Sequence, residues 1–559
     1  MADSDYIPLM FQAQIEGRSQ IHRLDPGVAG HQQQAYDWAQ QWQDGCDAKN
    51  MPKFSPNCQT KDYNFTWRMV TNSGQDGVIR PVIGERGWAY YPGSSMKGAF
   101  ARCCTLEQKL LYCGGVGDDG EIHPGILRFH GGYPKNDDWL DDSLVDLIHP
   151  QEGWQLNGNA ASRRTVIQLS LYQPKLTFGI SSLKPLSEDE WQQIWQIWEK
   201  ALGKGIGSRV SAGYGQIKTH GATNLLIVGL QGTGLASKRI DGVAEFRPNG
   251  FKAALRGHTK RLLCGVTDDN TAEKFTNQLW GGVGGRNGAI AGLLGVAFSA
   301  PNLELAMHRS GQYEMPIYDT GEAVLNILLL NQKLSDQVFG RSRQLSETDR
   351  KNLKILATQI VKFSMLMGGF GKSWRRIDHS IFFPDYLQAN QNPAIGCHWK
   401  FCGRNWDRYV VPVDRLADIT AFLNGLQTKV AGFPLLQELQ GGNPQNTLQE
   451  AWCEDNVQVW GRIAEDKNDS LAVRWFHGNY QGQKSIKRSP LTGSMGQIGR
   501  IWHRMYPRYQ KQGEELKETG AFVELMTIFP NRLGRPEDIQ KTADFLKFLE
   551  YSADFTHLW

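Results

Sequence analysis

The sequence predicts an α+β protein of 559 residues in which two related modules follow one another. Two segments of the first half support this prediction. Residues 91–100 (YPGSSMKGAF) have the composition of a strand end, a glycine turn and the first turn of a basic helix. Residues 203–215 are a glycine-rich loop that carries Lys204 and Arg209. Backbone N–H groups at a helix start or in a glycine loop, with cations beside them, are suited to binding phosphate.

A weaker set of the same landmarks follows downstream in the same order. Residues 246–256 (FRPNGFKAALR) resemble residues 90–100, and residues 281–284 repeat the Gly-Gly-Val-Gly of residues 114–117. Residues 368–376 (GGFGKSWRR) are the counterpart of the glycine loop. Three landmarks in one order indicate a duplicated module within the chain.

Alternating apolar residues predict the strands of the first module at residues 64–70, 165–172 and 175–180. Between the first two strands we expect a helix that Ser94 or Ser95 caps and that runs to about residue 112.

A second helix is predicted over residues 187–202, because Ser187 and Glu190 form a capping box and Gly203 ends the helix. Residues 214–218 then continue as a strand. A β–α–β–β–α–β order is that of a ferredoxin-like module.

We place the first module at residues 1–224, with an opening strand and turn at 6–24 and an insertion at 31–64 that is a loop or a short helix. The second module takes residues 225–559, and its pattern weakens into a C-terminal extension at about 390–559.

Inside the second module, the sequence predicts a strand at residues 290–298 and a helix at 346–367, whose first turn is acidic. Strand candidates in the extension are residues 457–463, 471–476 and 521–529.

The composition narrows the class of protein. No apolar run approaches the roughly 18 residues needed to cross a bilayer, and the acidic start MADSDY is not a secretory signal. The 9 cysteines lack regular spacing, so we expect reduced thiols in a cytoplasmic protein. The net charge is only +4, yet basic clusters with aromatic residues occur at 372–376 and 500–508. That mixture is typical of single-stranded RNA surfaces, but it also fits solvated cations beside core aromatics.

The turn-helix and glycine-loop motifs resemble those of the RAMP superfamily of CRISPR-associated proteins, in particular the backbone subunits of type III effector complexes. That family carries a Pro-Gly-Ser-Ser-hydrophobic-Lys-Gly turn-helix and a C-terminal glycine-rich loop on a modified RNA-recognition-like fold. Residues 65–218 match best, and residues 225–380 match as a degenerate second copy. The resemblance implies a gene fusion of two backbone modules in a prokaryotic antiviral ribonucleoprotein.

In this family, a loop before the turn-helix carries an aspartate that cuts target RNA. The matching loop here is residues 76–83, so the resemblance makes Asp76 the candidate catalytic residue. Asp241 is a weaker candidate in the second copy, where the loop is shorter. RNA is cleaved when its own 2′-OH attacks the adjacent phosphate in line, and a carboxylate can orient the hydroxyl or hold Mg²⁺ or Mn²⁺. Both aspartates precede glycine, which is also ordinary turn chemistry.

Motif position implies further guide-RNA contacts in both copies. In the first copy the family's arginine four residues after the lysine is replaced by Ala101, with Arg102 next to it, whereas the second copy keeps that spacing. The implied contacts are Ser94, Ser95, Lys97, Arg102, Lys204, Arg209, Tyr214, Lys252, Arg256, Lys372, Arg375 and Arg376.

Other kinds of site are less well supported by the sequence. A P-loop at Lys372-Ser373 fails because its first glycine is replaced by Leu366. Zinc binding by the cysteines lacks a CxxC spacing, so no structural zinc and no protein metal site are predicted. His258 and His503 could serve a guide-processing ribonuclease, but no paired set of acid and base residues is evident.

The expected function is therefore binding of guide RNA and cleavage of paired target RNA within a complex of other effector subunits, with no membrane partner. Two alternatives stay open: a non-catalytic RNA-binding scaffold, and an endoribonuclease that processes guide RNA.

Overall fold

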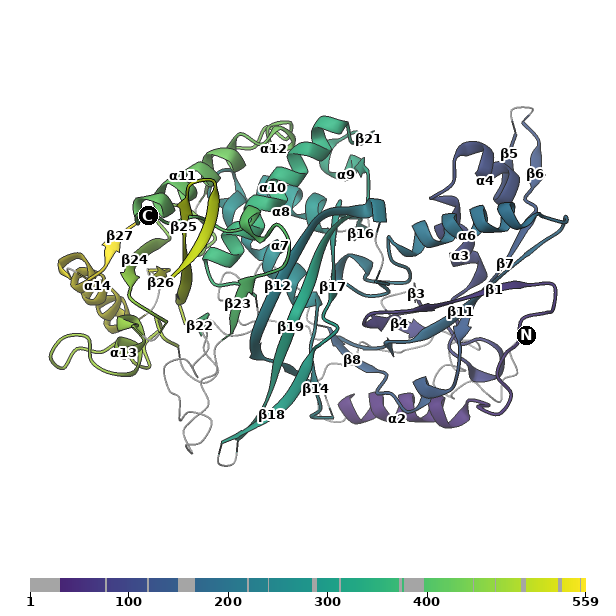
Figure 1. Ribbon diagram of the computed structural model, residues 1–559, viewed down its shortest axis with the longest axis horizontal. Helices are drawn as coiled ribbons and strands as arrows, with labels where there is room; N and C mark the ends of the chain where they lie inside the picture. Colours follow the sequence, from purple (N-terminus) through teal and green to yellow (C-terminus); the bar gives the residue numbers. More distant parts are fainter. Residues whose placement is uncertain are drawn as a thin grey trace. The chain divides into compact units, whose positions relative to one another are not determined.

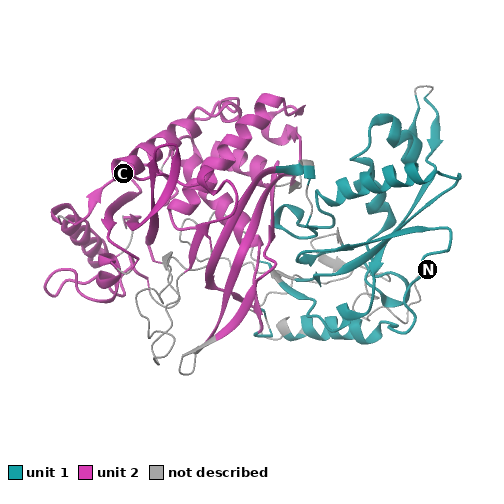
Figure 2. Cartoon of the chain, in the orientation of Figure 1, with its two compact units in different colours: residues 1–151, 160–224, 239–242 teal, residues 152–159, 225–238, 243–559 magenta. Residues whose placement is uncertain are grey.

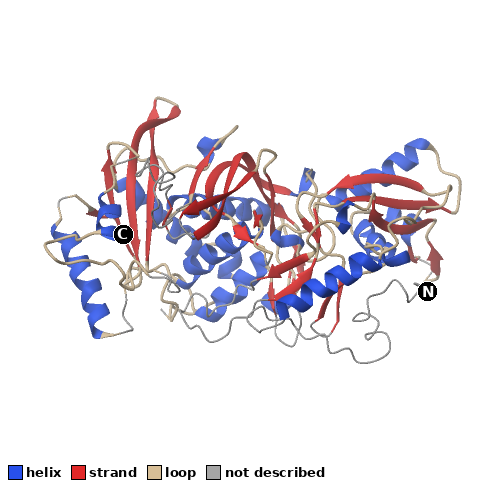
Figure 3. Ribbon diagram, turned by 90° about the horizontal axis from the view of Figure 1, so that it is seen from below, coloured by secondary structure: helices blue, strands red, loops and turns tan. Residues whose placement is uncertain are grey.

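A computed structural model provides the fold of the chain (Figure 1). Its contacts divide the chain into two compact units (Figure 2). Unit 1 contains residues 1–151, 160–224 and 239–242, and unit 2 contains residues 152–159, 225–238 and 243–559. Helices and strands are interleaved in both units (Figure 3), which confirms the predicted mixed α+β class. The residues that the structure describes are 31–75, 78–117, 120–148, 166–218, 221–239, 241–283, 289–310, 313–370, 375–376, 397–445, 447–467, 469–493, 499–530, 535–552 and 554–559.

The main sheet of unit 1 has three antiparallel strands in the order β1–β11–β7. A bridge between Phe65 and Ile217 places the segment that follows α6 beside the end of β1. Helices α3 and α6 bury Phe100 and Trp198 in one core with Phe178 of β11, and the ring centroids of Phe178 and Trp198 are 5.0 Å apart. The bounds are β1 Gln59–Asn64, α3 Gly93–Ala101, β7 Leu127–Pro134, β11 Lys175–Ser182 and α6 Glu188–Leu202.

Short antiparallel strand pairs and two further helices surround this sheet. A second core, formed by Trp42, Trp88 and Trp139, holds α2 (His31–Gly45) against the loops. The remaining bounds are β2 Arg68–Met69, β3 Asn72–Gln75, β4 Val78–Pro81, α4 Leu106–Cys113, β5 Gly114–Val116, β6 Ile122–Pro124, β8 Val145–Ile148, β9 Val166–Leu169 and β10 Leu171–Tyr172.

Unit 2 begins with a sheet of the same connectivity. Its path is β17–β19–β12–β23. The first strand in sequence, β12, lies between the third, β19, and the fourth, β23, just as β1 lies between β11 and the segment at Ile217 in unit 1. Helix α7 follows the first strand and α10 follows the third, as α3 and α6 do in unit 1. The bounds are β12 Asn224–Leu235, β13 Ser237–Lys238, β14 Ala244–Glu245, α7 Asn249–Cys264, α8 Asp269–Trp280, β15 Gly282–Val283, β16 Ala289–Ile290, β17 Leu294–Ser299, β18 Glu304–Ser310, β19 Tyr313–Leu329, β20 Lys333–Leu334, α9 Asp336–Phe339, β21 Arg343–Gln344, α10 Glu347–Leu366 and β23 His398–Phe401.

The two copies also agree in small details. Each has a helix after the first one, α4 or α8, that ends at a glycine in the left-handed region and enters a β-hairpin. The φ and ψ angles are 80° and 172° at Gly114 and 83° and 156° at Gly281. The repeated Gly-Gly-Val motif therefore marks the same turn in both copies.

The C-terminal region contains the connectivity a third time, which the sequence analysis missed. Its sheet runs β22–β25–β26–β24–β27. Among the last four strands, β24 comes first in the sequence and again lies between the third, β26, and the fourth, β27. All pairs among those four strands are antiparallel. The bounds are β22 Arg375–Arg376, α11 Ala417–Ala431, α12 Pro434–Gln437, β24 Gln458–Ala464, α13 Leu471–His477, β25 Ile501–Gln512, β26 Glu515–Ile528, α14 Pro536–Tyr551 and β27 Thr556–His557.

This third sheet is covered on both faces. Along β26, Val523 and Leu525 share a core with Leu423 of α11, while Met526 and Ile528 share another with α13 and α14. Residues that alternate along a strand point to opposite faces. No open face of the sheet is therefore left for a ligand among the described residues.

Several predicted elements differ in the structure. The helix expected to run to about residue 112 breaks into α3 and α4, because Thr105 and Gln108 form a new capping box. Residues 31–64, predicted to be a loop or short helical insertion, end in Gln59–Asn64, which is strand β1 of the main sheet. The strand predicted at 64–70 is reduced to β2 and a bridge at Phe65, and residues 214–218 supply only the bridge at Ile217. Residues 471–476 are helix α13 rather than a strand. The strand expected at 6–24 lies outside the described residues.

Candidate functional site

The turn-helix motif of residues 91–100 begins α3, and its glycine packs closely against β7. A Cβ on Gly93 would lie 2.0 Å from the carbonyl oxygen of Phe129. On β7, Gly131 has a φ of +79°, and a Cβ there would lie 2.2 Å from the carbonyl oxygen of Tyr91. The Gly93 N–H donates to the hydroxyl of Tyr90 at 3.1 Å. The glycine in this motif is required by packing, and the helix start is held by the sheet.

The polar side chains of this motif point outward. Ser94, Ser95, Lys97 and Arg102 are exposed, whereas Met96 is buried. The helix therefore presents the hydroxyls of Ser94 and Ser95 in its first turn and the cation of Lys97 shortly after them, whereas Arg102 is the C-cap at the other end. A helix N-terminus carries a partial positive charge, so this surface favours an anion such as phosphate.

Several residues of the glycine loop after α6 have a left-handed backbone conformation, with positive φ. Gly205, Gly207, Gly213 and Gly215 have φ values of +81°, +82°, +93° and +59°. Arg209 is left-handed as well, with φ of +58°, and it is exposed. Lys204 is half-buried.

Backbone hydrogen bonds connect the glycine loop to the start of α3. The N–H of Ser208 donates to the carbonyl of Val70 at 3.0 Å. The next residue, Thr71, accepts from the N–H of Val82 at 2.6 Å, and Val82 accepts from the N–H of Tyr90 at 3.1 Å.

The hairpin β3–β4 occupies the sequence between Thr71 and Val82, so its base is part of this connection. Asp76 itself lies outside the described residues, which end at Gln75 and resume at Val78. The fold thus brings the glycine loop, the α3 start and the base of the Asp76 hairpin together.

The buried side chain of Tyr214 stabilises the glycine loop. Its side chain is buried, its hydroxyl donates to a carboxylate oxygen of Asp146 at 2.7 Å, and its ring lies 4.5 Å from that of Trp67. Gln168 also donates to Asp146, at 2.8 Å. The ring of Tyr214 is packed in the interior and is not a stacking surface. Asp146 was not singled out from the sequence, although a single carboxylate in an apolar strand is the signal that could have identified it.

The second copy places Asp241 in the turn between β13 and β14, and in the sequence Asp76 likewise falls between β3 and β4. The carboxylate of Asp241 pairs with Arg239, and Nη2 and Oδ2 are 3.0 Å apart. Among the described residues, no group of three His, Cys, Asp or Glu side chains could hold a metal ion.

The predicted cations of the second copy are partly engaged within the protein. Arg256 donates to Asn277 at 2.8 Å and to Glu273 at 3.4 Å, and burial lowers the pKa of Arg256. Lys252 is half-buried. Lys372 lies outside the described residues, and Arg375 and Arg376 are described only as backbone of β22, which pairs in parallel with β25.

The two candidate histidines are interior residues. His258 is 7% exposed and packs edge-on against Phe363 and Trp502. His503 is fully buried and its Nε2 lies 3.0 Å from a carboxylate oxygen of Glu524. Neither can approach an RNA phosphate in this conformation, which removes the support for a guide-processing ribonuclease at these residues.

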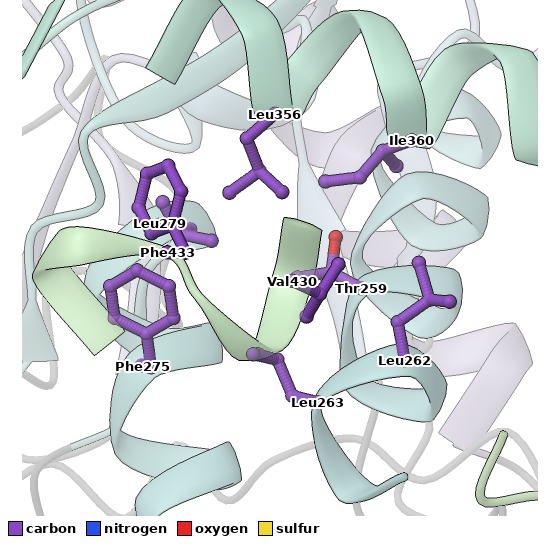
Figure 4. Close-up of a pocket in the computed structure, with 9 residues that line it drawn as sticks. All are labelled: Thr259, Leu262, Leu263, Phe275, Leu279, Leu356, Ile360, Val430 and Phe433. Atoms are coloured by element: carbon purple, nitrogen blue, oxygen red, sulfur yellow. The ribbon is translucent and has the colours of Figure 1, made fainter. Parts of the chain in front are cut away.

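One small pocket lies among α7, α8, α10 and α11–α12 (Figure 4). Its volume of about 10 Å³ holds no more than a water molecule. The only polar lining residue is Thr259, whose hydroxyl already donates to the Leu255 carbonyl and accepts from Trp280. The pocket is a packing gap in the core of unit 2.

Comparison with known proteins gives limited similarity. No family model and no curated protein matches the chain. A chain of a solved structure described as "Cryo-EM structure of the Type III-B Cmr-beta bound to cognate target RNA" is similar, with 19% sequence identity and a TM-score of 0.23. The similarity covers 37% of this chain and 69% of that chain. Within the described residues, no helix has both the length and the apolarity required to cross a bilayer.

Proposed function

We propose that this chain is a guide-RNA-binding backbone subunit of a type III CRISPR effector and that it cuts guide-paired target RNA. The observation that carries the proposal is the connection of the glycine loop, the α3 start and the base of the Asp76 hairpin by consecutive backbone hydrogen bonds. Two phosphate-binding elements next to the base of a hairpin whose sequence carries an aspartate fit the cleavage of a held RNA strand.

The strand order supports an RNA-binding architecture. In each copy the order of strands and helices is that of a ferredoxin-like module, and we propose that the chain contains three such modules in tandem. The first module retains both landmarks, the second retains them in weaker form, and the third has no glycine loop between α14 and β27. We therefore assign guide binding to the first two modules and an architectural role to the third.

The proposed reaction is an in-line transesterification. The 2′-hydroxyl of the target RNA loses its proton and its oxygen attacks the adjacent phosphorus, while the bond to the 5′-oxygen of the next nucleotide breaks and that oxygen takes up a proton. The products are a 2′,3′-cyclic phosphate and a 5′-hydroxyl. Asp76 would orient the attacking hydroxyl, while Lys97, Lys204 and Arg209 would hold phosphates. We also propose that a divalent cation, Mg²⁺ or Mn²⁺, would neutralise charge at the attacked phosphate, as the family resemblance implies.

A non-catalytic scaffold is the second candidate, and one observation favours it for the second module. Asp241 is held in an ion pair by Arg239 two residues away, so its carboxylate is engaged. We propose that the second module binds guide RNA without cutting.

The test is cleavage of a labelled, guide-complementary RNA by the assembled complex, with Mg²⁺ or with EDTA. Asp76→Ala is expected to abolish at least one cut at a defined position while guide RNA remains bound. Asp241→Ala, the matched control, is expected to leave the cleavage pattern unchanged. An unchanged pattern with Asp76→Ala would refute catalysis in the first module and leave the scaffold function. Cleavage of precursor guide RNA alone would instead identify a processing enzyme.

A further inference from the structure

A buried carboxylate joins the glycine loop of unit 1 to the hairpin β8–β9. Asp146 lies on β8 and is 1% exposed. Its Oδ2 accepts from the hydroxyl of Tyr214 in the loop at 2.7 Å and from the side-chain amide of Gln168 on β9 at 2.8 Å. A buried donor that loses its acceptor is costly, so this contact fixes the loop against the hairpin.

Arg68 makes a second connection between the same two segments. Its carbonyl accepts from the N–H of Gly215 in the loop at 2.9 Å. Its side chain is fully buried, and Nη1 donates to the carbonyl of Ser143 at 3.2 Å and to the hydroxyl of Ser170 at 3.0 Å. Ser143 precedes β8 and Ser170 directly follows β9, so the open end of the hairpin is held as well.

The hairpin β8–β9 also contacts the hairpin whose sequence carries Asp76. Strand β9 packs beside β4, the second strand of that hairpin. The hairpin β8–β9 therefore contacts both the glycine loop and β4, and it sets the position of one relative to the other.

The second copy lacks the hydroxyl of Tyr214. The Gly-Tyr-Gly of residues 213–215 is replaced by Gly-Phe-Gly in residues 369–371. Phe370 is also buried, and its ring centroid lies 4.8 Å from that of Phe251. The first glycine of each triplet is left-handed, with φ of +93° in the first copy and +72° in the second. A phenylalanine therefore fits the same buried position but offers no hydrogen bond.

The second copy also lacks the buried carboxylate. Strand β18 and the first half of β19 form a hairpin after β17, as β8 and β9 do after β7. The carboxylates on its paired residues, Glu304, Glu314 and Asp319, are all exposed. Both members of the Asp146–Tyr214 pair are thus missing from the copy whose Asp241 is held in an ion pair.

We infer that Asp146 and Tyr214 are positioning residues that hold the glycine loop, with its bound RNA phosphates, at a fixed distance from Asp76. The inference rests on the proposed cleavage, because a module that only binds RNA does not need this alignment. Misplacement of reacting groups by about 1 Å can slow a reaction about a hundredfold. Binding that is shared among several exposed cations tolerates such a shift. Loss of the pair therefore slows cutting more than it weakens RNA binding.

The test compares single-turnover cleavage of a labelled, guide-complementary RNA by the saturating assembled complex with the affinity of the complex for that RNA. Tyr214→Phe gives the first loop the residue of the second copy. It is expected to cut at the same position about tenfold or more slowly, with RNA affinity within about threefold of wild type. Tyr63→Phe is the matched control, because its hydroxyl donates to Glu199 at 3.2 Å outside the loop. Its cleavage rate is expected to equal that of wild type.

Asp146→Ala removes the acceptor of the same contact. The double variant with Tyr214→Phe is expected to cut no more slowly than Asp146→Ala alone, because both changes act through one contact. If Asp146→Ala does not assemble, Tyr214→Phe decides alone.

Three results would overturn the inference: a wild-type rate in Tyr214→Phe, rate losses that multiply in the double variant, or a loss of RNA affinity as large as the loss of rate. A wild-type complex that makes no cut dependent on Asp76 would instead refute the proposed function, and this inference with it.

Discussion

Gly207→Ala tests the idea that the glycine loop depends on close backbone contact. A Cβ at this position would lie 2.4 Å from the carbonyl oxygen of Val70, which accepts the hydrogen bond from Ser208. Gly120 provides a matched control, because its φ of +79° is close to the +82° of Gly207 but a Cβ there would meet nothing within 4 Å.

The expected cost has two parts. A non-glycine residue in the left-handed region costs about 1–2 kcal/mol. The contact with Val70 also breaks the bond from Ser208, which contributes about 0.5–1.5 kcal/mol. A total of about 2 kcal/mol corresponds to roughly a thirtyfold change in the opening equilibrium of the loop.

Amide hydrogen exchange of the peptide covering residues 203–215 measures this opening in the full chain. Gly207→Ala is expected to accelerate exchange there about thirtyfold and to weaken guide-RNA binding. Gly120→Ala is expected to leave both unchanged. An acceleration in Gly207→Ala of no more than about fivefold would refute the close-contact argument, since a left-handed cost of about 1 kcal/mol alone accounts for that much.

Two further predictions concern buried carboxylates. Tyr214→Phe removes a hydrogen bond to the buried carboxylate of Asp146 and is expected to lower the unfolding free energy by about 1–3 kcal/mol in urea, whereas Tyr551→Phe, at a residue 79% exposed, is expected to leave it unchanged. Equal urea midpoints for the two variants would contradict this role of Tyr214. Burial alone would raise the pKa of Glu524, but hydrogen bonds led by that from His503 hold it below its usual 4.5. Ionised Glu524 therefore stabilises the folded state above pH of about 4.5, and this contribution is lost as pH falls through the lower folded-state pKa. The stability advantage over Glu524→Gln is expected to shrink on acidification below pH of about 4.5, and an advantage independent of pH would count against it.

Local sequence signals predicted the elements whose stabilising contacts are local. Helix α6 begins after Ser187 as expected, because Ser187 and Glu190 cap each other within one turn. The repeated glycine motifs also marked equivalent turns correctly, since a left-handed residue next to a hairpin requires glycine in both copies.

Elements fixed by distant contacts were missed. Residues 471–476 have an apolar, aromatic composition that favours a strand, yet they form α13. The buried carboxylate of Glu524 accepts from the N–H groups of Leu471 and Ala472 and from the hydroxyl of Ser470, more than fifty positions away. Ser470 is a local cap signal, because its hydroxyl also accepts from the N–H of Val473, but the carboxylate that satisfies the next two N–H groups comes from another strand and leaves no local pattern.

The sequence by itself determined the start of α6 and the positions of the glycine turns at Gly114 and Gly281, because each depends on the conformational needs of neighbouring residues. Only the tertiary structure decided which strands pair, that the strand order occurs a third time at the C-terminus, and that Tyr214 lies inside rather than on the surface. Strand pairing and burial depend on segments far apart in the chain, and local patterns do not encode which of them meet.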